Sequence, residues 1–471
     1  MLTSPNETAH SSEIHALEHQ NLELTPPSGW SKLLFGQEPT LELMAILLVY
    51  GVQGVLGLAK LAISFFLKDQ LALSPTQVAA LMGVAMLPWV LKPIFGFVTD
   101  GLPIFGYRRR PYLVLSGLLG TAAWLSLATF VHTPELATVA ITVTTFSVAL
   151  SDVLVDSLIV ERARGESLSK SGSLQSLCWG AAALGGLLTA YASGLLLSKF
   201  TPQIVFAITA VFPLLVSAVA FWIDEQPIEM KESAVAQATN QVKQLWTALR
   251  QKEIWMPLMF VFFWQCTPTG ESSFFYFVTN DLGFKPEFLG QVRLVSSLAS
   301  LLGILVFQRY LKAVPFRTIF AWTTILSSLL GLTTLLLVTH ANRALGIDDH
   351  WFSLGDTLIL TVMGQVAFMP VLVLAARLCP PGIEATLFAL MMSVLNVAGL
   401  VSQEGGALLT HALGINEHNF DNLWILVTVT NLGGLLSLIF LNWLPGNEDD
   451  LVEANKSVES LGVAAQQKPT L

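Results

Sequence analysis

Residues 89–112 read W-V-L-K-P-I-F-G-F-V-T-D-G-L-P-I-F-G-Y-R-R-R-P-Y, a turn with three consecutive arginines between two apolar runs. The runs cover residues 76–99 and 111–131. Each has about the 20 residues that an α-helix needs to cross the hydrocarbon layer of a membrane. Positive charge is retained on the cytoplasmic side of a membrane protein. This stretch therefore predicts two membrane-spanning helices joined by a short cytoplasmic loop.

The same pattern of apolar runs and polar turns extends over most of the 471 residues. Only 12% of the residues are charged, whereas a soluble domain has roughly 25%. Charge this scarce cannot cover the outside of a soluble protein. The sequence therefore predicts an all-α integral membrane protein with twelve transmembrane helices, at residues 41–66, 76–99, 111–131, 136–160, 173–197, 203–223, 254–279, 286–308, 317–340, 355–379, 383–412 and 421–444.

The composition and the missing motifs argue against several classes of function. A net charge of −9 excludes the basic surface of a nucleic-acid-binding protein. Cys178, Cys266 and Cys379 stand singly in apolar runs, so we expect no disulfide, no metal site and no cofactor. The chain has no G-x-x-x-x-G-K-[ST], H-E-x-x-H or G-x-S-x-G motif. It is therefore predicted to be neither an enzyme nor an ATP-driven pump.

The distribution of Lys and Arg predicts the orientation in the membrane. With both termini on the cytoplasmic side, sixteen basic residues fall on that side, four on the other and four inside the spans. This asymmetry supports an even number of spans with both termini cytoplasmic. The first 40 residues have no apolar core, which argues against a cleaved signal peptide.

The longest internal polar segment, residues 224–253, divides the spans six and six. We expect six-helix halves at 41–223 and 254–445, with cytoplasmic tails at 1–40 and 446–471. Within the linker, residues 240–250 predict either an amphipathic helix on the membrane surface or a solvated helix. Two six-helix halves suit a secondary transporter that is built from repeats and has its site between them.

Charged residues at membrane depth are the candidates for function, because an unpaired charge there costs several kcal/mol. We take eight as lying at membrane depth, away from the polar turns: Lys60, Lys92, Asp152, Asp156, Glu271, Arg293, Arg377 and Glu404. None falls on the third or sixth span of either half. In the major facilitator architecture, which this six-plus-six arrangement resembles, those helices are peripheral and the others line the cavity. The eight charges are therefore expected to mark the transport pathway.

Asp152 and Asp156 are four residues apart, so both carboxylates lie on one face of a helix. Two like charges this close favour protonation of one of them, which suits a proton-coupled carrier. The alternative is that a basic residue on a neighbouring span neutralises each carboxylate, as Lys92 could neutralise Asp156.

Residues 265–276 read Q-C-T-P-T-G-E-S-S-F-F-Y. The proline and the glycine interrupt the backbone hydrogen bonds within the membrane, which is tolerated only where the freed groups meet water, protein or ligand. We interpret this segment, with Glu271, as a gate that lines the cavity. Phe275 and Tyr276 could stack on a flat heterocycle, or they could simply pack against neighbouring helices.

The remaining candidates are basic or polar. Arg293 and Arg377 suit bidentate binding of a carboxylate, and Lys92 and Lys60 are point charges for the same purpose. Gln403 and Glu404 add polar groups on the eleventh span. Single polar residues of this kind also form hydrogen bonds between helices without binding a ligand.

The segment 89–112, together with D-V-L-V-D-S-L-I-V-E-R-A-R at 152–164, F-F-Y at 274–276 and R-L-C-P-P-G-I-E-A-T at 377–386, resembles the folate–biopterin transporter family. This family is a branch of the major facilitator superfamily. The resemblance covers residues 41–445. It assigns to a cytoplasmic gate the residues Gly96, Asp100, Arg108, Arg109, Arg110, Glu161 and Arg162. In the superfamily, the aspartate and arginines of this motif hold neighbouring helix ends together in the outward-facing state.

The resemblance implies that the cargo is a folate or a pterin, carried by proton symport in the inner membrane of a bacterium, most simply as a monomer. Asp156 is then the candidate for the pterin or the proton, and Arg293 and Arg377 for the glutamate tail of folate. A carrier of another planar or anionic solute, such as a nucleoside, sugar or peptide, remains the alternative. With no extramembrane segment longer than about 30 residues between spans, a receptor is disfavoured.

Overall fold

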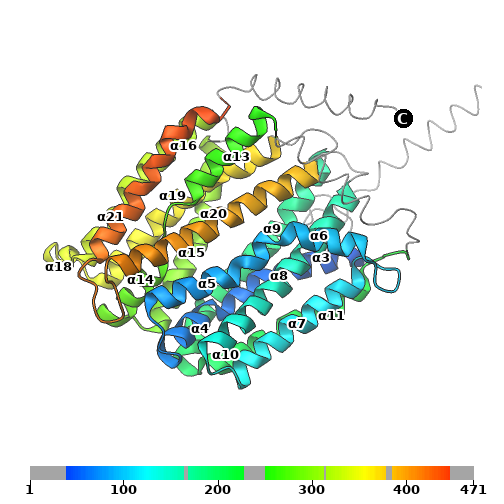
Figure 1. Cartoon of the computed structure of the whole chain (residues 1–471), viewed down its shortest axis with the longest axis horizontal. Coiled ribbons are helices and arrows are strands. Elements are labelled where there is room, and N and C mark those ends of the chain that lie inside the picture. Colours follow the sequence, from blue (N-terminus) through cyan, green and yellow to red (C-terminus); the bar gives the residue numbers. More distant parts are fainter. Residues whose placement is uncertain (1–38, 164–167, 228–249, 312–313, 378–383, 446–471) are drawn as a thin grey trace, which may run out of the picture.

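The computed structural model describes residues 39–163, 168–227, 250–311, 314–377 and 384–445. Within these ranges every regular element is a helix, which confirms the predicted all-α fold class. The predicted tails at 1–40 and 446–471, and residues 240–249 of the predicted interfacial helix, lie almost entirely outside the described residues. The long helices run side by side in one bundle, with the N-terminal half at the lower right of Figure 1 and the C-terminal half at the upper left.

The N-terminal half contains several short helical pieces in addition to its long helices. In chain order its elements are α3 (Leu41–Val55), η1 (Leu56–Leu58), α4 (Ala59–Phe65), η2 (Phe66–Gln70), α5 (Pro75–Val90), α6 (Lys92–Gly101), α7 (Arg110–Thr129), α8 (Pro134–Ala163), α9 (Leu168–Lys199), α10 (Pro202–Thr209), α11 (Val211–Val219) and η3 (Ala220–Trp222).

The C-terminal half is built in the same way. Its elements are α13 (Lys252–Gln265), α14 (Glu271–Tyr276), η4 (Phe277–Asp281), α15 (Pro286–Val306), η5 (Phe307–Leu311), α16 (Phe316–Gly331), α17 (Thr334–Val338), α18 (Ala341–Ala344), α19 (Asp349–Arg377), α20 (Glu384–Ala412), α21 (Leu423–Gly433) and η6 (Gly434–Trp443).

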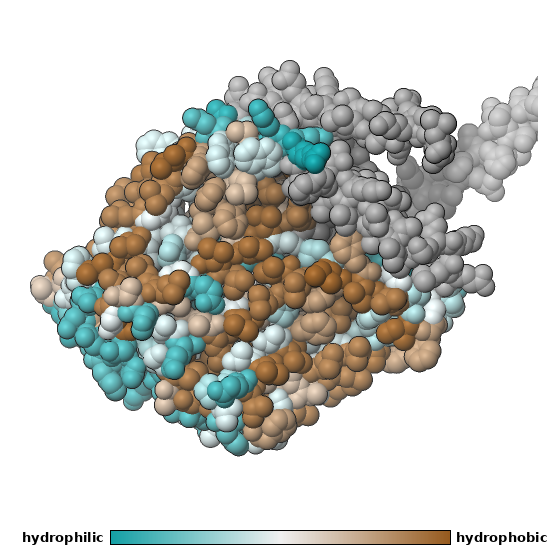
Figure 2. All heavy atoms as spheres, in the orientation of Figure 1, coloured by the Kyte–Doolittle hydropathy of each residue, from teal (hydrophilic) through white to brown (hydrophobic). Residues whose placement is uncertain are grey.

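Ten helices of the described part are long and apolar enough to cross a membrane. Each corresponds to one of the twelve predicted spans. The other two predicted spans are the interrupted segment α13–α14–η4 and the 29-residue helix α20. The count of twelve therefore stays a prediction. Hydrophobic side chains cover the flank of the bundle in Figure 2, and hydrophilic ones gather toward its two ends, as expected for a surface in contact with lipid.

The chain turns at two opposite ends of the bundle. We call the end opposite the described termini the far end; it lies at the lower left of Figure 1 and comprises the turns at residues 71–74, 130–133, 200–201, 282–285, 339–348 and 413–422. Helices start there with local signals. Ser74 forms a capping box with Gln77, and Pro75, Pro202 and Pro286 occupy first helical positions, where a missing N–H does no harm.

The predicted interruption of the seventh span is confirmed. α13 ends at Gln265 and α14 begins at Glu271. The freed backbone groups are bound by α20: the Thr269 N–H donates to the Ser402 carbonyl at 3.1 Å, and the Ser402 hydroxyl donates to the Thr267 carbonyl at 2.5 Å. Protein partners therefore satisfy these two backbone groups at the break in the membrane.

The tenth span begins six residues earlier than the predicted residue 355, because α19 starts at Asp349. The Asp348 side chain accepts a hydrogen bond of 2.9 Å from the His350 N–H, and the Asp348 carbonyl accepts one from the Phe352 N–H. This capping arrangement adds a polar turn to the helix. Asp356 consequently lies well inside the helix and not at its boundary.

The two halves pack closely at the far end through glycines. A side-chain carbon at Gly194 of α9 would lie 2.3 Å from the Pro286 carbonyl oxygen and 2.7 Å from the Gly290 Cα of α15. Only glycine allows this approach of two backbones. The aromatic ring of Tyr276, from the C-terminal half, is buried in a hydrophobic cluster of the N-terminal half.

We predict that Gly194→Ala lowers the melting temperature, because its methyl group would push α9 and α15 apart. Overpacking of this kind costs typically about 1–3 kcal/mol. Gly180→Ala on the same helix is the matched control, since a side-chain carbon there meets nothing within 4 Å. Thermal unfolding of both variants in detergent measures the difference. Equal melting temperatures would show that the close approach at Gly194 is not tight.

Candidate functional site

Two predicted candidates, Asp152 and Asp156, share one basic partner. The Lys92 ammonium donates to Asp152 Oδ2 and also lies 3.6 Å from Asp156 Oδ2. The Tyr50 hydroxyl donates to the other oxygen of Asp156, Oδ1. We call these four residues the Lys92 cluster. The pairing of Lys92 with a carboxylate, which the sequence left as an alternative, is thus present for both aspartates.

Three helices of the N-terminal half place this cluster. α3 carries Tyr50 and α8 carries the two aspartates one turn apart. Lys92 is the first residue of α6, directly after α5 ends, and Pro93 follows it. The bend between α5 and α6 turns the ammonium toward α8, and the Trp89 ring lies 5.2 Å from it. A cation over an indole ring is further stabilised in a site with little water.

Asp156 is the most accessible member of the cluster. Its side chain is 44% exposed, against 11% for Asp152 and 17% for Lys92. Asp156 lies seven residues before the end of α8, which is about 10 Å along the axis. The cluster therefore lies on the termini side of the middle of the bundle, and one of its carboxylates is accessible.

The charges of the Lys92 cluster do not balance when both carboxylates are ionised, because one ammonium faces two negative groups. The excess charge gives Asp156 two possible partners, a proton or the N–H groups of a ligand. Sequence reasoning missed Tyr50. Tyr50 lies within the apolar run of residues 41–66. A tyrosine hydroxyl in a membrane requires a hydrogen-bond partner, so this position could have indicated that Tyr50 contacts a polar residue on another span.

Arg293 lies in the other half, on α15, and reaches across to the N-terminal half. Its Nη1 donates to the Ser193 hydroxyl at 3.2 Å, and its Nη2 lies beside Gly57 of η1. Lys60 is one helical turn from Gly57, and it is exposed on a helix, α4, whose other side chains are buried or half-buried. Lys60 and Arg293 thus place two positive charges on facing helices.

Glu271, Gln403 and Glu404 lie in the C-terminal half, apart from the Lys92 cluster. Glu271 begins α14 and is exposed. Gln403 and Glu404 are half-buried on α20; the Gln403 Oε1 atom has no hydrogen-bond partner among the described residues. Glu404 packs against Gly83 of α5, where a side-chain carbon would come within 1.9 Å of its carboxylate. No described hydrogen bond joins these three residues to each other.

Phe275 and Tyr276 join the two halves in this conformation. The Phe275 ring packs edge-on against Phe65 of α4, with 5.4 Å between the ring centroids. Tyr276 is 1% exposed and its hydroxyl donates to the Leu73 carbonyl. This arrangement matches the packing alternative for both rings.

The far end of the bundle is closed by these contacts and by one polar pair. The Lys68 ammonium lies 2.9 Å from Asn280 Oδ1, which links η2 of the first half to η4 of the second. Another polar contact between the halves lies closer to the termini end, where the Asn396 amide donates to the Trp89 carbonyl at 3.0 Å. Among the described residues, no polar contact between the halves lies nearer to that end. The halves are therefore fastened at the far end, while Asp156 is accessible near the other.

The predicted gate motif forms a compact structure at the termini end. Asp100 pairs with Arg109 at 2.7 Å. The backbone N–H groups of Arg108, Arg109 and Arg110 all donate to the Glu225 carboxylate, at 2.5, 2.9 and 2.9 Å. Glu225 thus caps the N-terminus of α7 from the segment that follows η3. Sequence reasoning placed Glu225 in the linker and gave it no role.

The rest of the motif supports this cap. Arg110 donates through Nε to the Ile223 carbonyl at 2.8 Å, and Gly96 of α6 packs beside Val153 of α8. Gly106 has a φ of +83°, which favours glycine in the turn before the arginines. The side chains of Glu161, Arg162 and Arg377 lie outside the described part of the structure.

No group of three or more His, Cys, Asp or Glu side chains is arranged to hold a metal ion within the described ranges.

The fold defines the class of protein. The structure superimposes on the crystal structure of a D-xylose-proton symporter with a TM-score of 0.63, at 16% sequence identity, covering 86% of this chain and 98% of that one. At this identity the likeness establishes the fold, a multi-pass membrane bundle of the major facilitator type. The chain thus belongs to the class of multi-pass membrane proteins with this helical fold.

Residues 53–461 match the BT1 family, and the chain belongs to it. It is 59% identical over 429 residues to the folate-biopterin transporter of Synechocystis sp., covering 91% of this chain and 87% of that protein. It is 30% identical over 395 residues to folate transporter 2 of Plasmodium falciparum, covering 84% and 86% of the two chains. The predicted membership in the folate–biopterin transporter family is confirmed, and with it the prediction that the chain is a transporter and not an enzyme.

We predict that Glu225→Ala destabilises the protein, because three backbone N–H groups at the start of α7 lose their acceptor. Loss of a helix cap costs typically about 1 kcal/mol, up to about 2. Glu225→Gln, which keeps one acceptor oxygen, is expected to lie between wild type and the alanine variant. Thermal unfolding in detergent gives the order. A Glu225→Gln protein less stable than Glu225→Ala would contradict the capping role.

Proposed function

We propose that the protein carries folates or pterins across the inner membrane of a bacterium by alternating access, coupled to protons. The proposal rests on the Lys92 cluster, in which an accessible carboxylate shares one ammonium with a second carboxylate. The names of the relatives, a folate-biopterin transporter and a folate transporter, support the choice of cargo.

The cargo has two chemically different ends, and the site residues differ in the same way. A pterin is a flat heterocycle with paired N–H donors, which a carboxylate binds through both oxygens. Asp156 is the accessible carboxylate. The glutamate tail of a folate carries two carboxylates, for which a guanidinium is the preferred partner. Arg293 and Lys60 take that role, with Arg377 as a further candidate.

Proton coupling follows from the charge of the Lys92 cluster. When Asp156 is ionised, Lys92 is shared between two carboxylates, and the Tyr50 hydroxyl stabilises the charge that remains. A proton on Asp156 removes the excess charge and leaves Lys92 paired with Asp152 alone. The proton and the N–H groups of the pterin thus bind to the same carboxylate, Asp156. Binding of the proton therefore changes the affinity for the pterin, and binding of the pterin changes the affinity for the proton.

Alternating access requires that one end of the bundle is closed while the other is open. The fastened far end and the accessible Asp156 support the assignment of this conformation to one side of the cycle. With both termini cytoplasmic, it is the inward-facing state. Each chain contains both six-helix halves, so the protein works as a monomer. The fold alone, shared with a sugar symporter, also admits other planar or anionic solutes.

We predict that Asp156→Asn lowers folate uptake driven by a pH gradient at least about tenfold, equivalent to about 1.4 kcal/mol. The amide keeps the shape of the side chain but cannot gain and lose a proton. Uptake of labelled folate into proteoliposomes, with and without an imposed pH gradient, is the measurement. Asp421→Asn, in the far-end turns, is the control and keeps wild-type uptake. Normal gradient-dependent uptake by Asp156→Asn would remove this residue from coupling.

We predict that Arg293→Gln selectively impairs uptake of folate relative to biopterin, which lacks the glutamate tail. Hydrogen bonds to charged groups contribute about 1.5–3 kcal/mol, so folate uptake falls about tenfold or more while biopterin uptake changes little. Arg309→Gln, exposed at the end of the same span, is the control. Equal loss of both cargoes would leave Arg293 a role in contact between the halves. Competition by unlabelled sugars or nucleosides, but not folates, would instead identify a different cargo.

A further inference from the structure

A second carboxylate lies within the membrane bundle, far along the chain from the Lys92 cluster. Asp356 is on α19, seven residues after Asp349, the first residue of that helix. This is about 10 Å along the helix axis from its start at the far end of the bundle. The ninth span tightens locally opposite Asp356: α16 ends at Gly331 and α17 begins at Thr334, while Leu332 and Thr333 between them keep helical backbone angles. Asp356 Oδ1 lies 2.6 Å from the Thr333 hydroxyl, and Oδ2 lies 2.8 Å from the Thr334 hydroxyl.

The hydrogen bonds of Thr333 require one more proton than its hydroxyl can supply. Thr333 Oγ1 lies 2.5 Å from the Leu330 carbonyl oxygen as well as 2.6 Å from Asp356 Oδ1. Two oxygens at such distances are held together by a proton between them. A hydroxyl has a single proton, and neither a carbonyl nor an ionised carboxylate has one to donate. When Thr333 donates to Leu330, the second proton belongs to the Asp356 carboxyl.

We infer that Asp356 is a proton-binding site, occupied in this conformation, at which the carboxyl O–H donates to Thr333 while Thr334 donates to the other oxygen. The site goes beyond the proposed function, because it does not depend on which solute is carried. It is also separate from the Lys92 cluster, since it lies in the other half of the molecule and near the opposite end.

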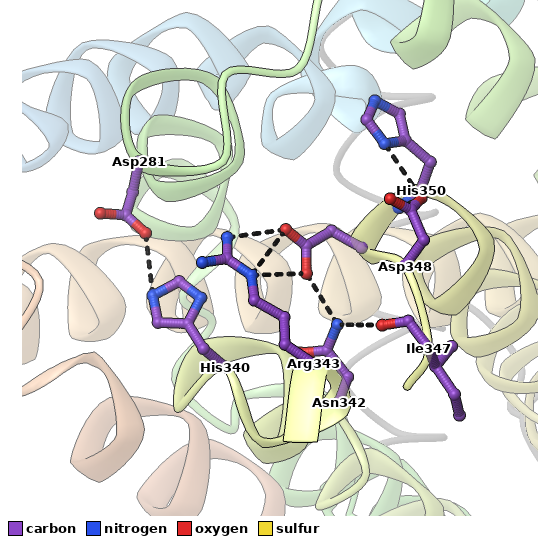
Figure 3. Close-up of polar contacts among 8 residues, drawn as sticks. Asp281, His340, Asn342, Arg343, Ile347, Asp348 and His350 are labelled. Carbon is purple, nitrogen blue, oxygen red and sulfur yellow. Dashed lines mark hydrogen bonds and ion pairs between the residues drawn. The ribbon is translucent and has the colours of Figure 1, made fainter. Parts of the chain in front are cut away.

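No cation favours the ionised form of Asp356, because its described contacts include no ion pair. The charged or titratable residues on the neighbouring elements have other partners or other positions. At the far end, His340 pairs with Asp281 at 3.2 Å and Arg343 with Asp349 at 2.7 Å, as Figure 3 shows. The Asp349 hydrogen bonds raise the pKa of Arg343 above its ordinary value. Of the remaining such groups on helices packed against α19, Arg293 of α15 donates to Ser193 and Arg317 of α16 donates to the Leu444 carbonyl. Glu287 of α15 and Glu404 and His411 of α20 make no described contact with Asp356. The side chain of Glu384 lies outside the described part of the structure.

The proton holds the break between α16 and α17 in place. With the proton, both threonines at the break are bonded to α19. Without it, Thr333 must choose between the Leu330 carbonyl and the carboxylate, so either the turn of α16 or the bond to α19 is lost. The break leads through α17 to His340, whose contact with Asp281 reaches η4, the element that Lys68 fastens to the first half. Release of the proton therefore loosens the C-terminal half beside the closed far end.

The test is infrared difference spectroscopy of the full-length protein in liposomes, without folate. We expect wild type to show the C=O stretching band of a protonated carboxyl. This band should weaken as the pH is raised. In Asp356→Asn the component of the band that comes from Asp356 should be missing. The amide of that variant can donate to Thr333 and accept from Thr334, so the melting temperature is expected to stay at the wild-type value. Identical carboxyl bands in wild type and Asp356→Asn, across acidic to neutral pH, would overturn the inference.

A second pair of variants keeps the test decisive if Asp356→Asn does not fold. Thr333→Val removes the acceptor of the proton, so the carboxyl band is expected to shift. Thr339→Val removes a hydroxyl that bonds only to the Leu335 carbonyl one turn below, and the band is expected to stay in place. An unshifted band in Thr333→Val overturns the inference. Because no solute is present, failure here is distinct from failure of the folate assay.

Discussion

The structure depends on one constraint: inside the bilayer, each charge and each free backbone group needs a partner within the protein. Lys92 shows how far this constraint reaches. It is the first residue of a helix that exists only because the second span bends, and the bend brings the ammonium against two aspartates of α8. The remaining imbalance is carried by Asp156, the most accessible member of the cluster. The transport site that we propose therefore lies where the pairing of charges is incomplete.

The same constraint operates at the two helix breaks of the C-terminal half. At the break between α13 and α14, the free backbone groups find partners on α20, including the carbonyl and the hydroxyl of Ser402. At the break between α16 and α17, the hydroxyls of Thr333 and Thr334 meet Asp356. The described contacts at the first break are made by neutral groups. At the second break the partner is a carboxyl group, and with the proton that we infer on it the break can respond to the solution at the far end.

The spans and the fold class could be predicted from the sequence, because hydropathy and the places of Lys and Arg are local properties of the chain. The positions of Asp152 and Asp156 on one helical face were also local, through their spacing of four. Their partners were not. Tyr50 lies 106 positions from Asp156, and Glu225 lies 115 to 117 positions from the N–H groups that it caps. Contacts over such separations follow from packing, which periodicity in one sequence does not encode. Asp356 was not predicted as a site residue for a simpler reason: the predicted span began at residue 355, so Asp356 was taken to lie at the edge of the membrane, whereas the helix begins at Asp349.

The two protonatable sites differ in what a proton does, and this difference bears on how a carrier avoids leakage. At the Lys92 cluster a proton changes the charge available to a solute, because Asp156 is accessible and already shares its cation. At Asp356 a proton changes the geometry of a helix break beside the contacts that close the far end. One site therefore acts on binding and the other on access. Coupled transport needs both, since a bound solute is moved only if the end that admitted it closes before the opposite end opens.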